Sequence, residues 1–288
     1  MGFFVKSVGV LLFFIWHESA LHGDAIATDR IPHRFSYDLD LRILGDYESP
    51  EPITIVCHGY GGSSLFVREL QKLNVFPGPL VGFNFPDHDI QPSYDYTQSS
   101  FGTFNEIAPL VYILRILVGD RPEKSIILYG FSAGGGAVIN TLVALVTGRY
   151  DDYLLQLGID LHEKELIMEA LKAGHIILDC PLKSLDEIFT VRPPTDELLF
   201  LASQYRSNGM TPIENLQYLV GADLTIWLHF QKPDEVLGNR DDELFVRLLT
   251  DANKEGTVRL ITGYDGGHSA LHCSLWNAYR SWLVVQEK

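Results

Sequence analysis

The sequence predicts an α/β protein with a mostly parallel central sheet and helices on both faces. Short apolar runs alternate with longer stretches of helical periodicity along the whole chain after residue 30. The composition fits a globular protein with a sizeable core, since 46% of the 288 residues are hydrophobic and 20% are charged. Glycine-containing loops directly follow several of the apolar runs, as expected where parallel strands end.

Charge and cysteine content limit the classes of partner and cofactor. The chain carries a formal net charge of −15 and has an isoelectric point near 5.0. No basic stripe could neutralise phosphates, so this charge argues against nucleic acid as a partner. The three cysteines, Cys57, Cys180 and Cys273, cannot all pair and show no Cys-x-x-Cys or Cys/His ligand spacing. We therefore expect no disulfide scaffold, no bound metal and no cofactor.

The N-terminal segment has the pattern of a secretion signal. Lys6 precedes an apolar run over residues 8–16, and the small-residue sequence Ala25-Ile26-Ala27 follows as a cleavage site. The run is too short to span a bilayer comfortably. We expect residues 1–27 to be a signal peptide, residues 28–288 to be the folded domain, and the protein to be secreted or periplasmic. Two alternatives stay open: an uncleaved segment that anchors the protein to a membrane, and a buried first helix.

The first strands and helices follow from the hydrophobic periodicity. Strict alternation over residues 35–43 predicts a half-buried strand, antiparallel to its neighbour and near a sheet edge. A largely apolar run over 53–57 predicts a strand that is covered on both faces. Beyond it we expect a helix over 64–73, a strand over 80–85 and a helix over 104–118.

The region before that last helix is polar and aromatic. Residues 91–102, including Tyr94, suit a loop over a pocket. The adjacent residues Asp87, His88 and Asp89 have the chemistry of metal ligands, but neighbours in a loop rarely all face one point. We therefore interpret them as a loop at the rim of a site.

The second half of the chain continues the alternation. We expect strands over 126–129, 176–179, 224–230 and 257–261, and helices over 137–146, 161–173, 242–253 and 270–285. The segment 181–223 is too long for a simple crossover between strands. Its helical patterns over 196–205 and 212–219 predict a small helical cap inserted over the active site.

A serine motif joins the strand over 126–129 to the helix that follows it. It reads Gly130-Phe131-Ser132-Ala133-Gly134, which has the G-x-S-x-G pattern. Between a strand and a helix, this pattern forms a sharp turn that holds a serine hydroxyl clear of the backbone. Glycines flank the serine because strand and helix approach closely there and leave no room for Cβ atoms. Ser132 is therefore the candidate nucleophile.

Three further loops follow strands and offer the groups that such a serine needs. The loop from His58 to Gly62 can point backbone N–H groups at a substrate oxygen. Asp234 and His268 follow the next two strands beyond the cap segment and offer an acid and a base. Each loop alone can also be read as an ordinary turn. Together they bring complementary groups to one edge of the sheet, in the chain order Ser, Asp, His.

This set of loops resembles the α/β-hydrolase fold family, and the resemblance covers essentially everything after residue 30. It implies a catalytic triad of Ser132, Asp234 and His268, with an oxyanion hole made by the backbone N–H groups of Tyr60 and Ala133. The sequence departs from the family in two respects. The oxyanion loop reads H-G-Y-G-G where many esterases have H-G-G-G, and one convincing strand precedes the first buried strand where the family usually has two.

The implied activity is cleavage of an ester or related acyl bond in a small-molecule substrate, through an acyl-enzyme intermediate. His268 would accept the proton of the serine hydroxyl, and Asp234 would orient the imidazole. Asp241 and Asp242 are rival acids, although both look like the first turn of the next helix. Other functions stay open: a serine peptidase or thioesterase with the same triad, an inactive binding protein on a hydrolase scaffold, and a metal-dependent enzyme built on residues 87–89.

Overall fold

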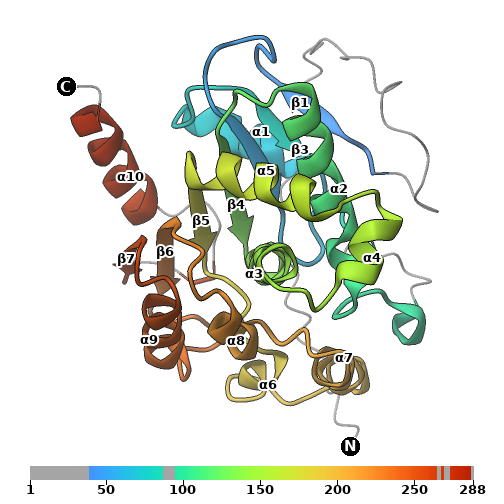
Figure 1. Cartoon of the computed structure of the whole chain (residues 1–288). Coiled ribbons are helices and arrows are strands. Elements are labelled where there is room, and N and C mark those ends of the chain that lie inside the picture. The colour runs from blue at the N-terminus through green and yellow to red at the C-terminus, as the bar shows by residue number, and fades with distance from the viewer. Residues whose placement is uncertain (1–38, 87–94, 265–266, 269–272, 287–288) are drawn as a thin grey trace, which may run out of the picture.

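The computed structural model describes residues 39–86, 95–264, 267–268 and 273–286, and its centre is a seven-stranded sheet in the order β1-β3-β2-β4-β5-β6-β7 (Figure 1). Every neighbouring pair of strands is parallel except β1 and β3, which are antiparallel. The prediction of a mostly parallel α/β sheet is therefore confirmed. The strands are β1 (Arg42–Leu44), β2 (Ile53–Cys57), β3 (Leu80–Gly82), β4 (Ile126–Phe131), β5 (His175–Asp179), β6 (Thr225–Gln231) and β7 (Thr257–Gly263).

Helices separate almost all of these strands. The longer helices are α1 (Phe66–Leu73), α2 (Phe104–Asp120), α3 (Ala133–Val146), α5 (Leu161–Lys172), α7 (Asp196–Ser207), α9 (Asp242–Ala252) and α10 (Cys273–Gln286). The shorter ones are η2 (Tyr96–Gln98), α4 (Asp151–Gln156), α6 (Leu185–Ile188), α8 (Pro212–Asn215) and η3 (Leu216–Tyr218). No helix among the described residues combines the length and the apolar character needed to cross a bilayer.

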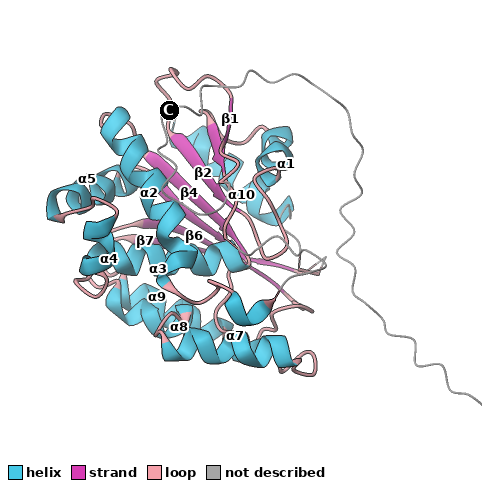
Figure 2. Cartoon of the chain, turned by 90° about the vertical axis from the view of Figure 1, so that its right-hand side faces the viewer, coloured by secondary structure: helices cyan, strands magenta, loops and turns pink. Residues whose placement is uncertain are grey.

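The sheet has a hydrophobic core on each face. Strand side chains alternate between the faces, so Ile126 and Leu128 of β4 enter one core while Ile127 and Tyr129 enter the other. Helices α2, α3, α5 and α9 cover the first face, and α1 and α10 cover the second (Figures 1 and 2). Both faces being covered explains why the strands are continuous apolar runs.

Some predicted elements are shorter than expected. The edge strand predicted over 35–43 is regular only in β1, and its first four residues lie outside the described residues. The strand predicted over 80–85 ends at Gly82, although the Asn84 N–H still donates to the Leu39 carbonyl at 2.7 Å. The helical pattern predicted over 212–219 is confirmed in two pieces, because α8 passes directly into the tighter turn η3.

Several predictions fall outside the described residues. These are the signal peptide over 1–27, the acidic and histidine loop over 87–89, and Tyr94. The segment 181–223 lies within the described residues and contains α6, α7, α8 and η3 between β5 and β6.

Candidate active site

Ser132 lies in a strained turn between β4 and α3. Its backbone has φ 53° and ψ −120°, a conformation that a non-glycine residue rarely adopts. The surrounding backbone holds the turn in place. The Ser132 N–H donates to the Asp179 carbonyl at 3.0 Å, and the Ser132 carbonyl accepts from Gly135, Gly136 and Leu182. A strained backbone that several hydrogen bonds maintain is typical of a functional position, so Ser132 is a candidate for one.

The flanking glycines have the steric role expected from the sequence. A Cβ on Gly130 would lie 2.7 Å from the Gly134 carbonyl oxygen, and one on Gly134 would lie 2.3 Å from the Cys57 carbonyl oxygen. Neither position can hold a side chain without moving backbone. The close approach of α3 to β4 and to the end of β2 therefore requires glycine at both positions.

The loop after β2 passes directly beside this serine. A Cβ on Gly59 would lie 3.2 Å from the Ser132 Cβ, so the Gly59–Tyr60 backbone borders the serine turn. Ala133 is the first residue of α3, and its N–H consequently has no intrahelical partner. The Tyr60 hydroxyl donates to Glu197 Oε1 at 2.8 Å, which ties this loop to helix α7.

His268 and Asp234 form a buried pair at the same edge of the sheet. His268 Nδ1 lies 2.9 Å from Asp234 Oδ2, and both side chains are only 5% exposed. The other carboxylate oxygen of Asp234 accepts the backbone N–H groups of Val236 and Leu237. Burial alone raises the pKa of Asp234, but the hydrogen bond and positive charge of His268 and the two backbone donors outweigh it and lower the net pKa. The surroundings of Asp234 therefore favour its ionised form.

His268 and the serine turn are neighbours without a direct hydrogen bond. The imidazole of His268 packs on the ring of Phe131, the residue before Ser132, with ring centroids 4.9 Å apart. Within the described part of the chain, the Ser132 hydroxyl makes no hydrogen bond to His268. Such a bond is often long or absent without substrate and tightens in the substrate complex.

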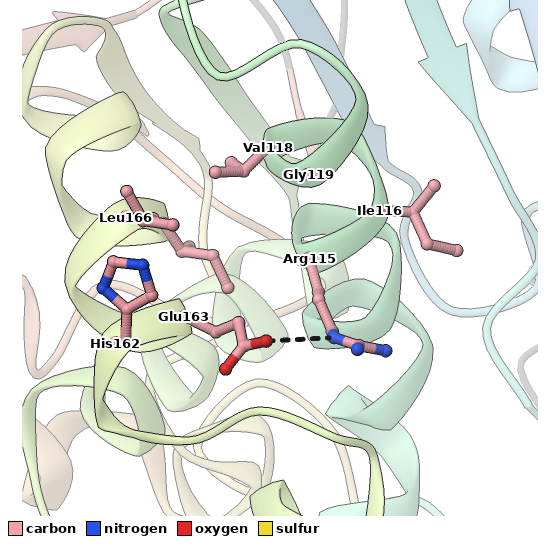
Figure 3. Close-up of a pocket in the computed structure, with 8 residues that line it drawn as sticks. Arg115, Ile116, Val118, Gly119, His162, Glu163 and Leu166 are labelled. Atoms are coloured by element: carbon pink, nitrogen blue, oxygen red, sulfur yellow. Dashed lines mark ion pairs between the residues drawn. The ribbon is translucent and has the colours of Figure 1, made fainter.

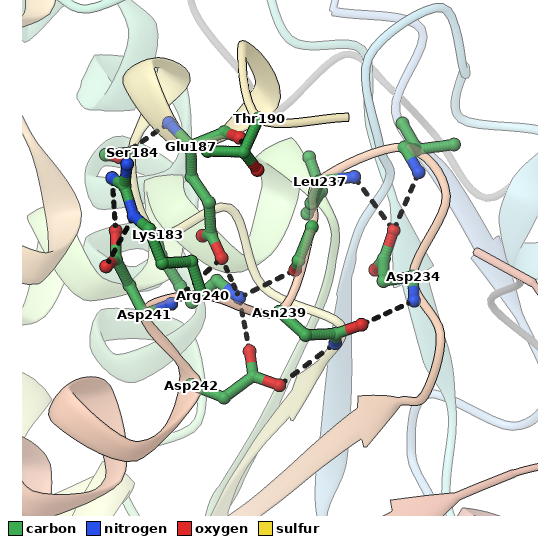
Figure 4. A network of polar contacts seen from close by, with 12 residues as sticks. Lys183, Ser184, Glu187, Thr190, Asp234, Leu237, Asn239, Arg240, Asp241 and Asp242 are labelled. Carbon is green, nitrogen blue, oxygen red and sulfur yellow. Dashed lines mark hydrogen bonds and ion pairs between the residues drawn. The ribbon is translucent and has the colours of Figure 1, made fainter. Parts of the chain in front are cut away.

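A buried ionic network fixes the loop that carries Asp234 (Figure 4). The Asn239 side chain accepts the Asp234 N–H at 2.7 Å and donates to Asp242 Oδ2 at 2.9 Å. Asp242 also pairs with Lys183, which is 2% exposed and donates to the Gly238 carbonyl. Because Asp242 is the first residue of α9 and is bound to Lys183, it serves this network and does not contact His268.

The other rival acid also has a different partner. Asp241 is the N-cap of α9, and its carboxylate accepts hydrogen bonds from the Arg240 guanidinium. Both rivals therefore lie at the start of α9, as the sequence indicated, and Asp234 is the carboxylate that contacts the histidine.

A second histidine–carboxylate pair lies beside the first and was not identified from the sequence. His229 Nδ1 lies 2.7 Å from Asp179 Oδ1, and both side chains are fully buried. The Tyr129 hydroxyl donates to Asp179 Oδ2 at 2.7 Å, and the Ser274 hydroxyl lies 3.3 Å from His229 Nε2. A histidine inside an otherwise apolar strand was the available signal, because buried polar groups require partners.

Cys180 lies between the two pairs. Its Sγ and the ligand atoms of Asp179 and His229 lie within 4.8 Å of one another, as do those of Cys180, Asp234 and His268. Either group has the donor types of a zinc site. Burial, followed by the charges of Asp179 and Asp234, raises the pKa of the Cys180 thiol well above its usual value. In each group the carboxylate already contacts a histidine, at 2.7 Å for Asp179 and His229 and at 2.9 Å for Asp234 and His268.

A groove elsewhere on the surface is not lined by any of the candidate site residues. It lies between α2 and α5, has a volume of about 430 Å³, and is lined by apolar side chains together with His162, Arg115 and Glu163 (Figure 3). Arg115 Nε and Glu163 Oε1 pair across it at 4.0 Å. The end of α2 leads to the amino end of β4, so this groove lies away from the carboxyl ends of the strands.

Comparison with known proteins gives matches in structure but not in sequence. No protein-family model matches the chain, and no curated protein matches it in sequence. A carboxylesterase from Lactobacillus plantarum aligns with a TM-score of 0.57 at 15% identity, over 87% of this chain and 91% of the carboxylesterase. An esterase from Pyrococcus furiosus aligns with a TM-score of 0.54 at 17% identity, over 86% of this chain and 87% of the esterase.

A third similar structure belongs to a larger protein. An acylaminoacyl peptidase, crystallised with a chloromethyl ketone, aligns with a TM-score of 0.56 at 13% identity. The alignment covers 88% of this chain but 40% of the peptidase, so the likeness concerns only part of that protein. All three comparisons extend over most of the sheet and its helices.

Proposed function

The chain has the α/β-hydrolase fold, and from that premise we propose that it is a serine hydrolase that cleaves an ester or related acyl bond. The observation that carries this proposal is the presence, at one edge of the sheet, of a strained serine turn beside a buried His–Asp pair. In this fold the chemistry gathers at the carboxyl ends of the strands.

In the proposed mechanism Ser132 attacks the acyl carbonyl and His268 accepts its proton. A serine hydroxyl is a weak nucleophile at neutral pH, so a base must lie within reach. His268 Nδ1 faces Asp234, which fixes the ring so that Nε2 is the nitrogen turned toward substrate chemistry. The same Nε2 would then give this proton to the leaving group, which departs and leaves the acyl group on Ser132. His268 would next activate a water molecule, which hydrolyses the acyl-enzyme and releases Ser132.

The backbone N–H groups of Tyr60 and Ala133 are proposed as the oxyanion donors. Each such donor is worth about 3 kcal/mol of barrier lowering. The position of Gly59 against the Ser132 Cβ and the place of Ala133 at the start of α3 support this assignment. The contact of Glu197 with the Tyr60 hydroxyl supports the interpretation of 181–223 as a cap over the site.

A fluorophosphonate probe tests the proposal on the full chain. We expect the probe to label the wild-type protein and to leave Ser132→Ala unlabelled, because the probe bonds covalently to an activated serine. Turnover of a small ester should fall by about four to six orders of magnitude in the same variant. Ser281→Ala is the matched control, since this exposed hydroxyl donates only to Asn277 of its own helix α10. Labelling that survives Ser132→Ala would remove Ser132 from the mechanism.

A panel of substrates distinguishes the alternative functions. Ester, thioester and peptide substrates of matched acyl group would distinguish an esterase from a thioesterase and a peptidase. Absence of labelling and of hydrolysis across the panel would favour a binding protein on the hydrolase scaffold.

A further inference from the structure

The side chain of Asn239 spans the loop that carries Asp234, which runs over residues 232–241 between β6 and α9 and is called the acid loop below. Its Oδ1 accepts the Asp234 N–H at 2.7 Å, and its Nδ2 donates to the Gln231 carbonyl at 2.7 Å. The direction of both bonds is fixed, because a backbone N–H only donates and a carbonyl only accepts. Nδ2 also donates to Asp242 Oδ2, so one amide joins the end of β6, the proposed acid and the start of α9 (Figure 4).

A buried ion cluster holds the second half of the acid loop. Lys183 and Glu187 come from the first residues of the predicted cap, and both side chains are buried. The Lys183 ammonium donates to the Gly238 carbonyl at 3.0 Å and pairs with Asp242. Glu187 Oε1 accepts the Asp241 N–H at 3.1 Å. The loop backbone is therefore held on both sides of the asparagine, which keeps the amide in place.

The carboxylate of Asp234 makes contacts that do not set its place on the sheet. Oδ1 accepts the N–H groups of Val236 and Leu237, and these bonds move with the turn to which they belong. Asn239 instead connects the Asp234 backbone to the last residue of β6, a strand that is paired on both sides by β5 and β7. The position of the carboxylate beside His268 Nδ1, at 2.9 Å, is thus referred to the sheet through this amide.

We infer that Asn239 is a positioning residue for Asp234, an inference that rests on the function proposed above. It acts on the backbone of Asp234 and, through the carboxylate, on His268. Displacing a catalytic group by about 1 Å can cost on the order of 100-fold in rate. Loss of the amide should therefore slow the chemical step while the substrate pocket is kept.

Asn253 offers a matched control at the opposite end of β6. Its Oδ1 accepts the Leu224 N–H at 2.8 Å, and its Nδ2 donates to the Leu224 carbonyl at 2.7 Å. The bonds are of the same kind as those of Asn239, but they lie just before the first residue of the strand. Asn253→Ala therefore removes comparable bonds without touching the acid loop, and it reports the effect of stability alone.

Kinetics on the full chain compare the two asparagines. Asn239→Ala should lower kcat for p-nitrophenyl acetate about tenfold with little change in KM, because the acid is displaced from the histidine. Asn253→Ala should keep the wild-type kcat, whatever its thermal midpoint. If Asn239→Ala does not fold, Asn239→Ser, which also removes the amide but loses less volume, should show the same fall. A wild-type kcat in the folded Asn239 variant, or an equal fall in Asn253→Ala, would overturn the inference.

A second readout distinguishes this inference from the proposed function. The ring C–H NMR signals of His268, identified by their loss in His268→Gln, should shift in Asn239→Ala and stay unchanged in Asn253→Ala. This result is expected whether or not the protein hydrolyses an ester. A shift in a protein without esterase activity would support the positioning of Asp234 and count against the hydrolase. Unchanged His268 signals would mean that Asn239 serves only the stability of the acid loop, and would overturn the inference.

Discussion

Two histidine–carboxylate pairs lie side by side at the carboxyl edge of the sheet, and they differ in the partner of the second ring nitrogen. In both pairs Nδ1 contacts an aspartate, at 2.7 Å for His229 and 2.9 Å for His268. His229 Nε2 contacts Ser274, whereas His268 makes no other hydrogen bond within the described residues. A buried His–Asp pair is therefore not by itself a catalyst. It becomes a candidate where Nε2 lies beside a candidate nucleophile such as Ser132.

The two carboxylates differ in the same way. Asp234 accepts from the backbone of its own loop, within three residues, so it organises a local turn. Asp179 accepts side-chain bonds from Tyr129 of β4 and His229 of β6, so it joins three adjacent strands through the interior. The first arrangement favours function, because a loop can present a group to substrate. The second favours stability.

The largest expected effect is a loss of activity when the Asp234–His268 pair is broken. Asp234→Asn should lower kcat by about 10⁴ while leaving the fold intact, because the imidazole loses the partner that sets its tautomer and stabilises its charge. Asp242→Asn is the matched control and should lower kcat far less, since Asp242 contacts Lys183 and Asn239. Steady-state hydrolysis of a small ester checks both. The reverse ranking would transfer the role of acid to Asp242.

The next effect is a loss of stability when the Asp179–His229 pair is broken. Asp179→Ala should lower the free energy of unfolding by about 3–5 kcal/mol, because the Tyr129 hydroxyl and the His229 Nδ1–H lose their buried acceptor. Asp179→Asn keeps one acceptor oxygen and should cost less than Asp179→Ala. Urea unfolding monitored by circular dichroism measures both variants. Wild-type stability in Asp179→Ala would show that this pair does not join the strands energetically.

The fold was largely predictable because both faces of the sheet are covered. Buried parallel strands appear in the sequence as apolar runs, and β2, β4, β5, β6 and β7 all fall where the runs predicted them. Short polar helices gave no such signal. Helices α4 and α6 have six and four residues, too few for periodicity to identify them. The first and last residues of the edge strand β1 were harder to predict, because β1 pairs with β3 over only three residues.

The candidate site was predictable where a residue follows a strand in a glycine loop, as Ser132 and His268 do. Such positions have a sequence signature because the backbone geometry itself demands glycine. The second histidine–carboxylate pair, His229 with Asp179, was not predictable in this way. Contact between Asp179, His229 and Ser274 depends on the register of β5 with β6 and on the docking of α10, and local patterns carry neither. Asp179 did, however, end an apolar run, and His229 interrupted one.

The smallest effect concerns how the Asp234 pair responds to acid. The folded-state pKa of Asp234 lies below its usual value, so the folded state binds fewer protons at this group than the unfolded chain does. The stability that this carboxylate contributes is therefore fully present above its unfolded pKa, near 3.9, and is lost as pH falls through the lowered folded value. Thermal midpoints of wild type and Asp234→Asn, measured from pH 6 downward, should differ most at the upper end and converge below about pH 4. A constant difference would mean that the charge of Asp234 contributes nothing to stability, and that its bond to His268 matters for catalysis alone.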